Sequence, residues 1–327
     1  MRLHENKALF DQAIRATGSR MEIPDIYIEK DYWVTLALHT IFTDDIGKES
    51  VFKGGTSLSK CYGLIHRFSE DIDLVVFRNP EEKDKELTKK IRTISKTVEQ
   101  KLPEVHVEGI TNKKGMNRKT AHSYPQAFNG EYGQVRKEII VEATWLGYHE
   151  PYVEKQVYSY VYEMMMATGQ EKMITEYGLE PFKVWVLDVK RTICEKIMSL
   201  VRFSYEENPI EALSNKVRHT YDLHLLLKDG ELSEYFDSED FKEMLLKVAQ
   251  DDVGSFKNNN KWLVNHPSDA LIFKDVDGTW EQIKSVYEGS FSQLVFRDLP
   301  PSEDVRQTLE RISKRLSEIE EWDIAVE

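Results

Sequence analysis

The sequence contains little cysteine and no long apolar run. Its 327 residues include two cysteines, Cys61 and Cys194, which lack the paired spacing of a zinc site. The nine histidines are scattered without an H-x-x-H pair, which argues against a zinc enzyme. No apolar stretch reaches the length of a membrane span, and the N-terminus does not have the pattern of a signal peptide. We therefore expect a protein of the reducing cytoplasm that does not enter a membrane.

Positive charge is also in short supply. The 44 Lys and Arg residues stand against 57 Asp and Glu residues, for a formal net charge of −13. This acidity disfavours RNA binding, because RNA phosphates are bound through Lys and Arg. An acidic protein can still hold RNA where its basic residues gather around one cleft. Two segments are basic enough, 113–119 and 183–202, whereas the charged run 81–101 is typical of a solvated helix surface.

The most informative stretch is Phe52-Lys-Gly-Gly-Thr-Ser-Leu-Ser-Lys60. The chain before it is typical of the end of a buried strand. Gly54 and Gly55 carry no Cβ, so backbone N–H groups can approach an anion. Thr56 and Ser57 can cap the helix that follows and add hydroxyl donors at a natural phosphate site. The spacing is not that of a Walker P-loop, and alone the motif is more often an ordinary strand-to-helix turn.

Two aspartates follow within a segment of strand periodicity, from residue 71 to residue 77. Side chains two positions apart on a strand share a face at roughly 6–7 Å, so Asp71 and Asp73 point the same way. Two such carboxylates repel each other unless a cation lies between them, and Mg²⁺ prefers one or two carboxylates with substrate phosphate oxygens. The alternative is an edge strand with both aspartates in solvent, but Asp is depleted in strands. A phosphate loop beside a magnesium site predicts nucleotidyl transfer.

These two motifs, GGTSLSK and RFSEDIDL, together resemble the AbiEii/AbiGii toxin family of the DNA polymerase β-type nucleotidyltransferase superfamily. The resemblance covers about residues 29–227. Its weaker parts are the segments 188–196 and 218–223, in which Lys196 and Asp222 match the family's third and fourth motifs. Membership implies a toxin of a toxin–antitoxin or phage-defence pair, with a cognate antitoxin as partner.

The resemblance also implies the reactants. Characterised relatives, the MenT toxins, add nucleotides to tRNA 3′ ends, so a nucleoside triphosphate, Mg²⁺ and a tRNA or other RNA acceptor are expected. The base and the acceptor are not fixed by it. We expect the phosphates to lie over Gly54–Ser57 and Mg²⁺ to bridge them to Asp71 and Asp73. Lys60 and Lys196 would then steady the triphosphate.

The remaining candidates have supporting roles. Arg67 and Ser69 would support the aspartate strand, and Ser69 could also touch phosphate. Glu142 lies on a predicted strand over 135–145 and is our candidate for the third carboxylate of such enzymes, although a solvent-facing role is almost equally open. Either Glu142 or Asp71 would take the acceptor proton. Asp222 could orient Lys196 or Arg218, or face water.

For the fold, the sequence predicts a mixed α/β nucleotidyltransferase core with a small sheet over residues 1–205 and a helical C-terminal domain over 206–327. Pro80 is expected to open a long helix through Val98, and residues 111–132 are expected to form a flexible loop. Three other functions remain open. They are a metal-dependent nuclease using the two aspartates with Glu195 and Lys196, a nucleotide-binding module without catalysis, and transfer of the γ-phosphate.

Overall fold

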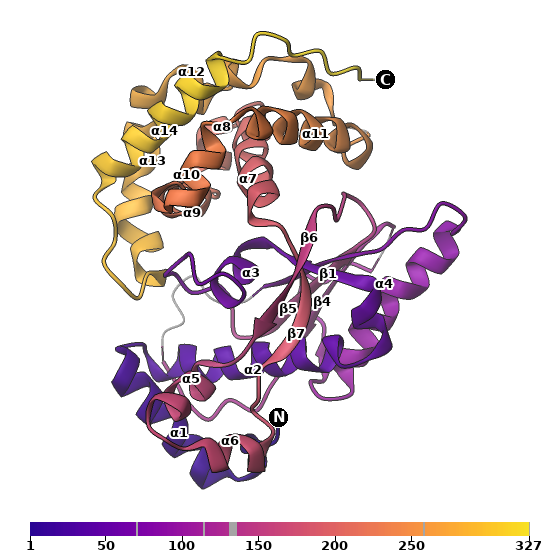
Figure 1. Ribbon diagram of the computed structural model, residues 1–327, viewed down its shortest axis with the longest axis vertical. Helices are drawn as coiled ribbons and strands as arrows, with labels where there is room; N and C mark the ends of the chain where they lie inside the picture. Colours follow the sequence, from indigo (N-terminus) through magenta and orange to yellow (C-terminus); the bar gives the residue numbers. More distant parts are fainter. Residues whose placement is uncertain (70, 114, 131–135, 258, 327) are drawn as a thin grey trace. The chain divides into compact units, whose positions relative to one another are not determined.

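The chain divides into two compact units in the computed structural model, which describes residues 1–69, 71–113, 115–130, 136–257 and 259–326 (Figure 1). The first unit comprises residues 1–63 and 68–187, and the second comprises residues 64–67 and 188–327. The boundary expected from the sequence, between residues 205 and 206, falls inside the second unit, just after its first long helix. The chain therefore crosses from one unit to the other at three places.

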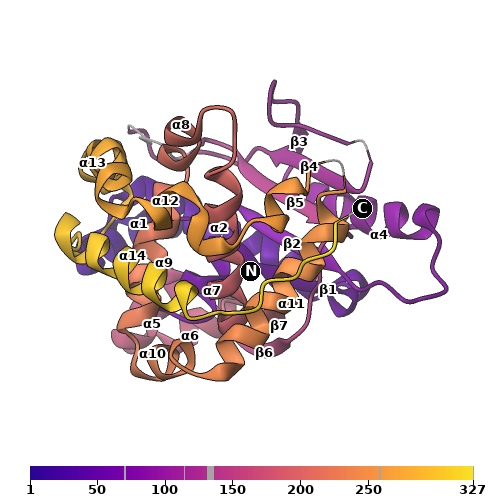
Figure 2. The same ribbon diagram turned by 90° about the horizontal axis from the view of Figure 1, so that it is seen from above.

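The first unit is built on a seven-stranded mixed sheet with the order β3-β4-β5-β2-β1-β7-β6 (Figure 2). The pairs β2–β5 and β1–β7 are parallel, and the remaining pairs are antiparallel. The strands are β1 (Ser50–Lys53), β2 (Ile72–Val76), β3 (Glu104–Val105), β4 (Asn117–His122), β5 (Ile139–Thr144), β6 (Tyr152–Val157) and β7 (Phe182–Leu187). A mixed sheet with many helices confirms the predicted α/β class.

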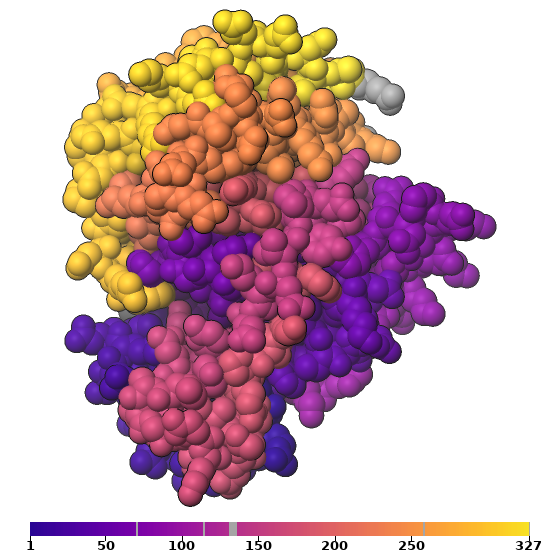
Figure 3. Space-filling view, in the orientation of Figure 1, coloured from indigo at the N-terminus to yellow at the C-terminus, as the bar shows by residue number. Residues whose placement is uncertain are grey.

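Helices surround this sheet. The central one, α2, is buried along almost its whole length, and α4 packs against β4 and β5 at the molecular surface, on the right of Figure 3. The α-helices of the first unit are α1 (Lys7–Met21), α2 (Asp25–Phe42), α3 (Gly54–Lys60), α4 (Asp84–Glu99), α5 (Tyr160–Ala167) and α6 (Glu171–Tyr177), and short 3₁₀ turns cover Leu3–Glu5 and Asp45–Glu49.

The structure differs from the sequence prediction in two places that matter for the site. Residues 117–122 form β4 inside the predicted flexible loop, because their backbone pairs along the whole of β5 although their side chains are polar. The helix expected from Pro80 begins only at Asp84. There Glu86 accepts a hydrogen bond from the Lys83 backbone N–H, a capping arrangement that fixes the start of α4.

The second unit is helical in the part of the chain that the structure describes, as the sequence predicts for the C-terminal region. Its last helix buries Val305, Leu309, Ile312 and Leu316 against helices of its own unit. None of the described helices is both long and apolar enough to cross a bilayer. The α-helices are α7 (Val189–Phe203), α8 (Pro209–Ser214), α9 (Val217–Lys228), α10 (Gly230–Phe236), α11 (Glu239–Ser255), α12 (Leu271–Lys274), α13 (Val276–Val286) and α14 (Ser302–Ser317), and shorter turns cover Lys261–Val264, Pro267–Asp269, Tyr287–Phe291 and Ser292–Leu294.

Candidate active site

The glycine turn and the aspartate strand are in direct contact, as the sequence motifs predict. Lys53, the last residue of β1, is paired in register with Asp73 of β2. Gly54 follows with φ +81°, and a Cβ at this position would overlap Asp73 Oδ2 and lie 3.2 Å from its Cγ. Only glycine allows both this backbone conformation and this approach. The glycine is therefore required by the position of the carboxylate.

Hydroxyl groups fix the short helix α3 to the chain that enters β2. Thr56 Oγ1 donates to the backbone carbonyl of Asp71 at 2.6 Å and lies 3.0 Å from Ser69 Oγ. Ser57 Oγ donates to the carbonyl of Gly54 at 2.8 Å, which closes the first turn. The structure thus brings Thr56, Ser57, Ser69 and Asp71 together with the glycine turn.

Four charged residues form one row across the sheet. Strand register pairs Lys53 with Asp73, Asp73 with Glu142 of β5, and Glu142 with Lys119 of β4. Register partners on adjacent strands project from the same face, about 5 Å apart. Asp73 and Glu142 are therefore neighbours between two lysines. Asp71, two residues before Asp73, adds its charge to the same place.

This crowding changes the protonation of the row. The pKa of Asp73 is raised to about 7, mainly by burial and in addition by the charges of Asp71 and Glu142. Burial also acts to raise the pKa of Glu142, but Lys119 at 2.8 Å and Asn117 at 2.7 Å hold it below its usual value. The lowered pKa keeps Glu142 ionised at neutral pH, whereas the raised pKa of Asp73 favours its protonated form.

The carboxylates suit a divalent cation. Asp71 Oδ1 is buried and accepts no hydrogen bond from the described residues, and its nearest cation is the guanidinium of Arg136 at 3.6 Å. A proton held by Asp73 is one that a cation would displace. No group of three His, Cys, Asp or Glu residues in the described ranges has the geometry of a complete metal site. Asp71 and Asp73 fit Mg²⁺, which takes one or two carboxylates and completes its shell with water and phosphate oxygens.

Lys60, the last residue of α3, lies in a buried polar contact. Its ammonium forms an ion pair with Asp31 of α2, donates to the carbonyl of Tyr158 at 3.1 Å and lies 4.9 Å from the centre of the Tyr160 ring. Asp31 also accepts from the Tyr160 backbone N–H at 2.8 Å. Lys60 therefore anchors the end of α3 to α2, and a contact with triphosphate stays a prediction.

The remaining predicted residues meet in the second unit. Asp222 of α9 accepts two hydrogen bonds from Arg67, at 2.7 and 2.8 Å, and one from Lys196 of α7 at 2.7 Å. All three side chains are buried. Burial alone would raise the pKa of Asp222, but the two cations lower it strongly. Asp222 thus contacts both Lys196 and Arg67, of which Arg67 is a partner that the sequence did not suggest. The roles of Lys196 and Asp222 in catalysis stay predictions.

Sequence reasoning did not assign Lys53, Asn117, Lys119 or Arg136 to the carboxylates. Lys53 directly precedes the glycine pair, which is a usable signal. Asn117 and Lys119 lie in the basic segment 113–119, within the flexible loop predicted over 111–132. Its Lys119 contacts Glu142 from a regular strand, whereas Lys114 lies outside the described residues.

Two aspartates of the C-terminal region, Asp275 and Asp277, have structural roles. Asp275 caps the start of α13 by accepting from the Gly278 N–H at 3.0 Å, and Asp277 pairs with Arg306 at 2.6 Å. Glu195, a candidate of the nuclease alternative, forms an ion pair with Arg191 at 3.0 Å.

Comparison with known proteins adds independent information. The family model described as "Nucleotidyl transferase AbiEii toxin, Type IV TA system" matches residues 37–321. Among solved structures, the chain is similar to MenT4, a nucleotidyltransferase toxin from Mycobacterium tuberculosis H37Rv, with 12% identity and a TM-score of 0.40 over 94% of this chain and 96% of that one. No curated protein sequence matches at a significant level.

Proposed function

Because the chain belongs to the AbiEii family of nucleotidyl transferase toxins, and is therefore a nucleotidyltransferase of a type IV toxin–antitoxin system, we propose that it transfers a nucleoside monophosphate from a nucleoside triphosphate to the 3′ end of an RNA, with tRNA as the acceptor. The observation that carries the proposal is the contact of Gly54 with Asp73, in register with Glu142. The glycine turn thus lies against one of two neighbouring carboxylates, as a triphosphate site next to a metal site requires.

The chain's own groups account for substrate placement. Backbone N–H groups of Gly54–Ser57 would face the triphosphate, and Asp71 and Asp73 would hold Mg²⁺ against it. Bound Mg²⁺ would neutralise charge on the attacking and leaving oxygens. The acceptor 3′ oxygen forms a bond to the α-phosphorus, the bond from that phosphorus to the bridging oxygen breaks, and pyrophosphate leaves.

We assign the acceptor proton to Asp71. Glu142 already accepts hydrogen bonds from Asn117 and Lys119, which lower its pKa and weaken it as a base. Asp71 Oδ1 accepts none among the described residues. Glu142 then acts as the third carboxylate by its charge, which keeps the neighbouring Asp73 at a raised pKa until a cation binds.

The ion cluster of the second unit includes a predicted phosphate-binding residue. Lys196 forms its ion pair with Asp222 there, and burial lowers the pKa of its ammonium group. We propose that Lys196 uses its positive charge to attract triphosphate oxygens. We also propose that the protein acts in the cytoplasm, where nucleoside triphosphates and RNA are both present, and that a cognate antitoxin opposes it.

The test uses each nucleoside triphosphate in turn, labelled at the α- or the γ-phosphate, with Mg²⁺ and unfractionated tRNA. The proposal expects RNA to gain the α-label and the γ-label to leave as pyrophosphate. Asp73→Asn should reduce incorporation by at least about a thousandfold, because the cation loses a ligand. The surface variant Asp298→Asn is the matched control. Shortened RNA, a γ-label in the product, or full activity in Asp73→Asn would overturn the proposal.

A further inference from the structure

Helix α4 carries a row of basic side chains on its exposed face. Lys85, Lys89, Arg92 and Lys96 follow one another at intervals of four, three and four residues, which places them on one stripe of a helix. All four are exposed, and the stripe spans about 16 Å of helix length. We call these four residues the α4 basic stripe.

The α4 basic stripe is not neutralised by its surroundings. Within the described residues, Lys85, Lys89 and Arg92 form no ion pair, and only Lys96 has an acidic partner, Glu99. Helix α4 holds five basic side chains against three acidic ones, in a chain of net charge −13, and Lys90, which is not part of the stripe, pairs with Glu49 and Glu82. A stripe of basic side chains on an acidic protein is a surface to which a nucleic-acid backbone is attracted.

Another amphipathic surface helix of the chain shows the contrast. On α14, Arg306 pairs with Asp277, Glu303 and Glu310, at 2.6 to 2.7 Å. Arg311 of the same helix pairs with Asp237 at 2.7 Å. Lys85, Lys89 and Arg92 of α4 differ from these two arginines because they have no acidic partner among the described residues.

The position of the stripe relates it to the candidate active site. On β4, Lys119 projects to the face that carries Glu142, and Arg118 projects to the opposite face, where it donates to Ser95 of α4 at 2.7 Å. Helix α4 therefore covers the face of the sheet that lies behind the carboxylates. From Glu142 on β5, only β4 and the two-residue β3 separate the carboxylates from the edge of the sheet, a distance of about 10 Å.

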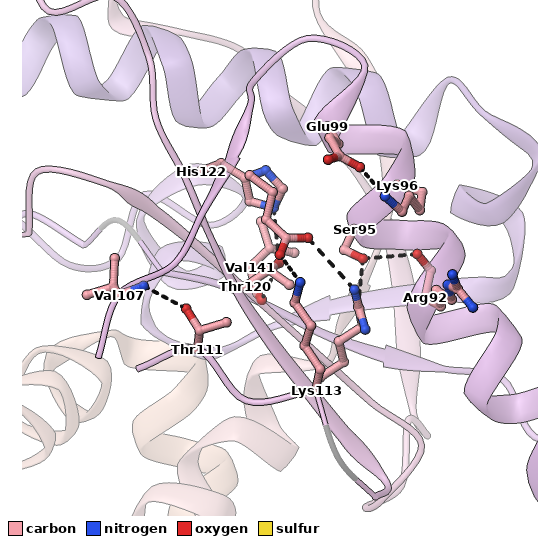
Figure 4. Close-up of polar contacts among 12 residues, drawn as sticks. Arg92, Ser95, Lys96, Glu99, Val107, Thr111, Lys113, Thr120, His122 and Val141 are labelled. Carbon is pink, nitrogen blue, oxygen red and sulfur yellow. Dashed lines mark hydrogen bonds and ion pairs between the residues drawn. The ribbon is translucent and has the colours of Figure 1, made fainter. Parts of the chain in front are cut away.

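Basic residues continue around this edge. Lys113 pairs with Glu104 of the edge strand β3 and is partly exposed (Figure 4). Glu104 also lies 3.8 Å from Arg118, which donates to Ser95 of α4. A polymer whose end lies at Asp73 can pass over β4 and β3 and meet the α4 basic stripe on the far side. A nucleoside triphosphate at the carboxylates is too small to make this path.

We propose that the α4 basic stripe binds the phosphate backbone of the RNA acceptor, at a distance from the nucleotide that is transferred. The inference rests on the proposed function for the identity of the RNA as acceptor. Contacts of this kind position a nucleic acid without reading its sequence, and they weaken as salt is added. The stripe would thus favour long acceptors over short ones.

The test compares the charge-reversal variant K85E/K89E/R92E with the control K228E/K257E/K274E, which reverses three exposed lysines of the second unit and changes the net charge by the same amount. Binding of unfractionated tRNA is measured at several salt concentrations. The stripe variant should bind at least about tenfold more weakly than the wild type, and the slope of log affinity against log salt should fall by about 2 to 3. The control should change far less.

Transfer is then measured with the same tRNA and with a short oligonucleotide that reproduces only the 3′ end. The stripe variant should lose efficiency through a raised KM for tRNA and keep wild-type kinetics with the oligonucleotide. Unchanged tRNA binding, or an equal loss in the control, would overturn the inference and leave the proposed function standing. If the wild type transfers nothing to RNA, the proposed function fails, but binding that depends on the stripe would still support an RNA surface.

Discussion

At Asp73, burial together with the charges of Asp71 and Glu142 raises the pKa to about 7. The unfolded chain binds this proton only below about pH 4. Since the folded pKa is the higher one, folding favours the protonated carboxyl. The resulting contribution to stability is complete below the unfolded pKa and is lost as the pH rises through the folded pKa. The residue that would bind the cation therefore weakens the fold at neutral pH when no cation is present.

We predict that Asp73→Asn, which mimics the protonated carboxyl, becomes more stable than the wild type as the pH rises from 4 to 8 in the presence of a chelator. The gain should reach about 2 to 4 kcal/mol, measured as the free energy of unfolding in urea. The exposed control Asp298→Asn should follow the wild type at every pH. Parallel curves for Asp73→Asn and the wild type would contradict the raised pKa.

At the scale of elements, the junction of β1 and α3 depends on Gly54, whose φ of +81° and closeness to Asp73 both exclude a side chain. Gly63 also has a positive φ, +65°, but nothing lies within 4 Å of a Cβ there. Alanine substitutions at these two glycines therefore separate two costs in stability, that of backbone strain alone and that of displacing the Asp73 carboxylate. Each alanine should lose about 1 to 2 kcal/mol from strain.

We predict that Gly54→Ala costs additional stability and abolishes nucleotide transfer, because Asp73 must move, whereas Gly63→Ala keeps the wild-type kcat. Thermal unfolding and α-label incorporation measure the two effects. Equal activity in the two variants would show that the contact between Gly54 and Asp73 does not matter for catalysis.

Elements also show what the sequence could and could not predict. The glycine turn and the aspartate strand are local in sequence, so their contact followed from the motifs and from the alternation of β2. The strand β4 was not predicted because Asn117–His122 lacks apolar alternation. Its strand structure comes from backbone pairing with β5. The neighbours of Glu142 could not be predicted from the sequence, because the register between strands is set by pairing with distant segments of the chain. The choice of Glu142 as third carboxylate remains a prediction, as does each residue role.

At the scale of the whole molecule, the short segment 64–67, which ends at Arg67, belongs to the second unit. The chain before residue 64 and the chain from residue 68 to residue 187 belong to the first unit. The guanidinium of Arg67 neutralises Asp222, and the bridge between Arg67 and Val295 adds a backbone contact within the second unit. Removing one partner of a buried ion pair typically costs about 3 to 5 kcal/mol, since the other charge stays buried. Lys196 still pairs with Asp222 after such a change, so the lower end of this range applies.

We predict that Arg67→Ala increases amide hydrogen exchange in α9 by about a hundredfold and leaves β2 nearly unchanged, although residue 67 is only five positions from β2 in sequence. Arg78→Ala, an exposed arginine just after β2, is the control and should affect neither. Faster exchange confined to β2 would show that Arg67 stabilises the first unit instead.

Because residues 64–67 belong to the second unit, recombination between genes of this family is also restricted. A gene fusion that replaces everything after Leu187 with the same region of a relative would exchange the partners of Arg67 but keep Arg67 itself. A recombinant of this kind would therefore keep the ion pair only if the incoming segment carries a buried acidic residue in the position of Asp222. Otherwise a second crossover would have to exchange residues 64–67 as well. We expect the two halves to descend together rather than to be shuffled.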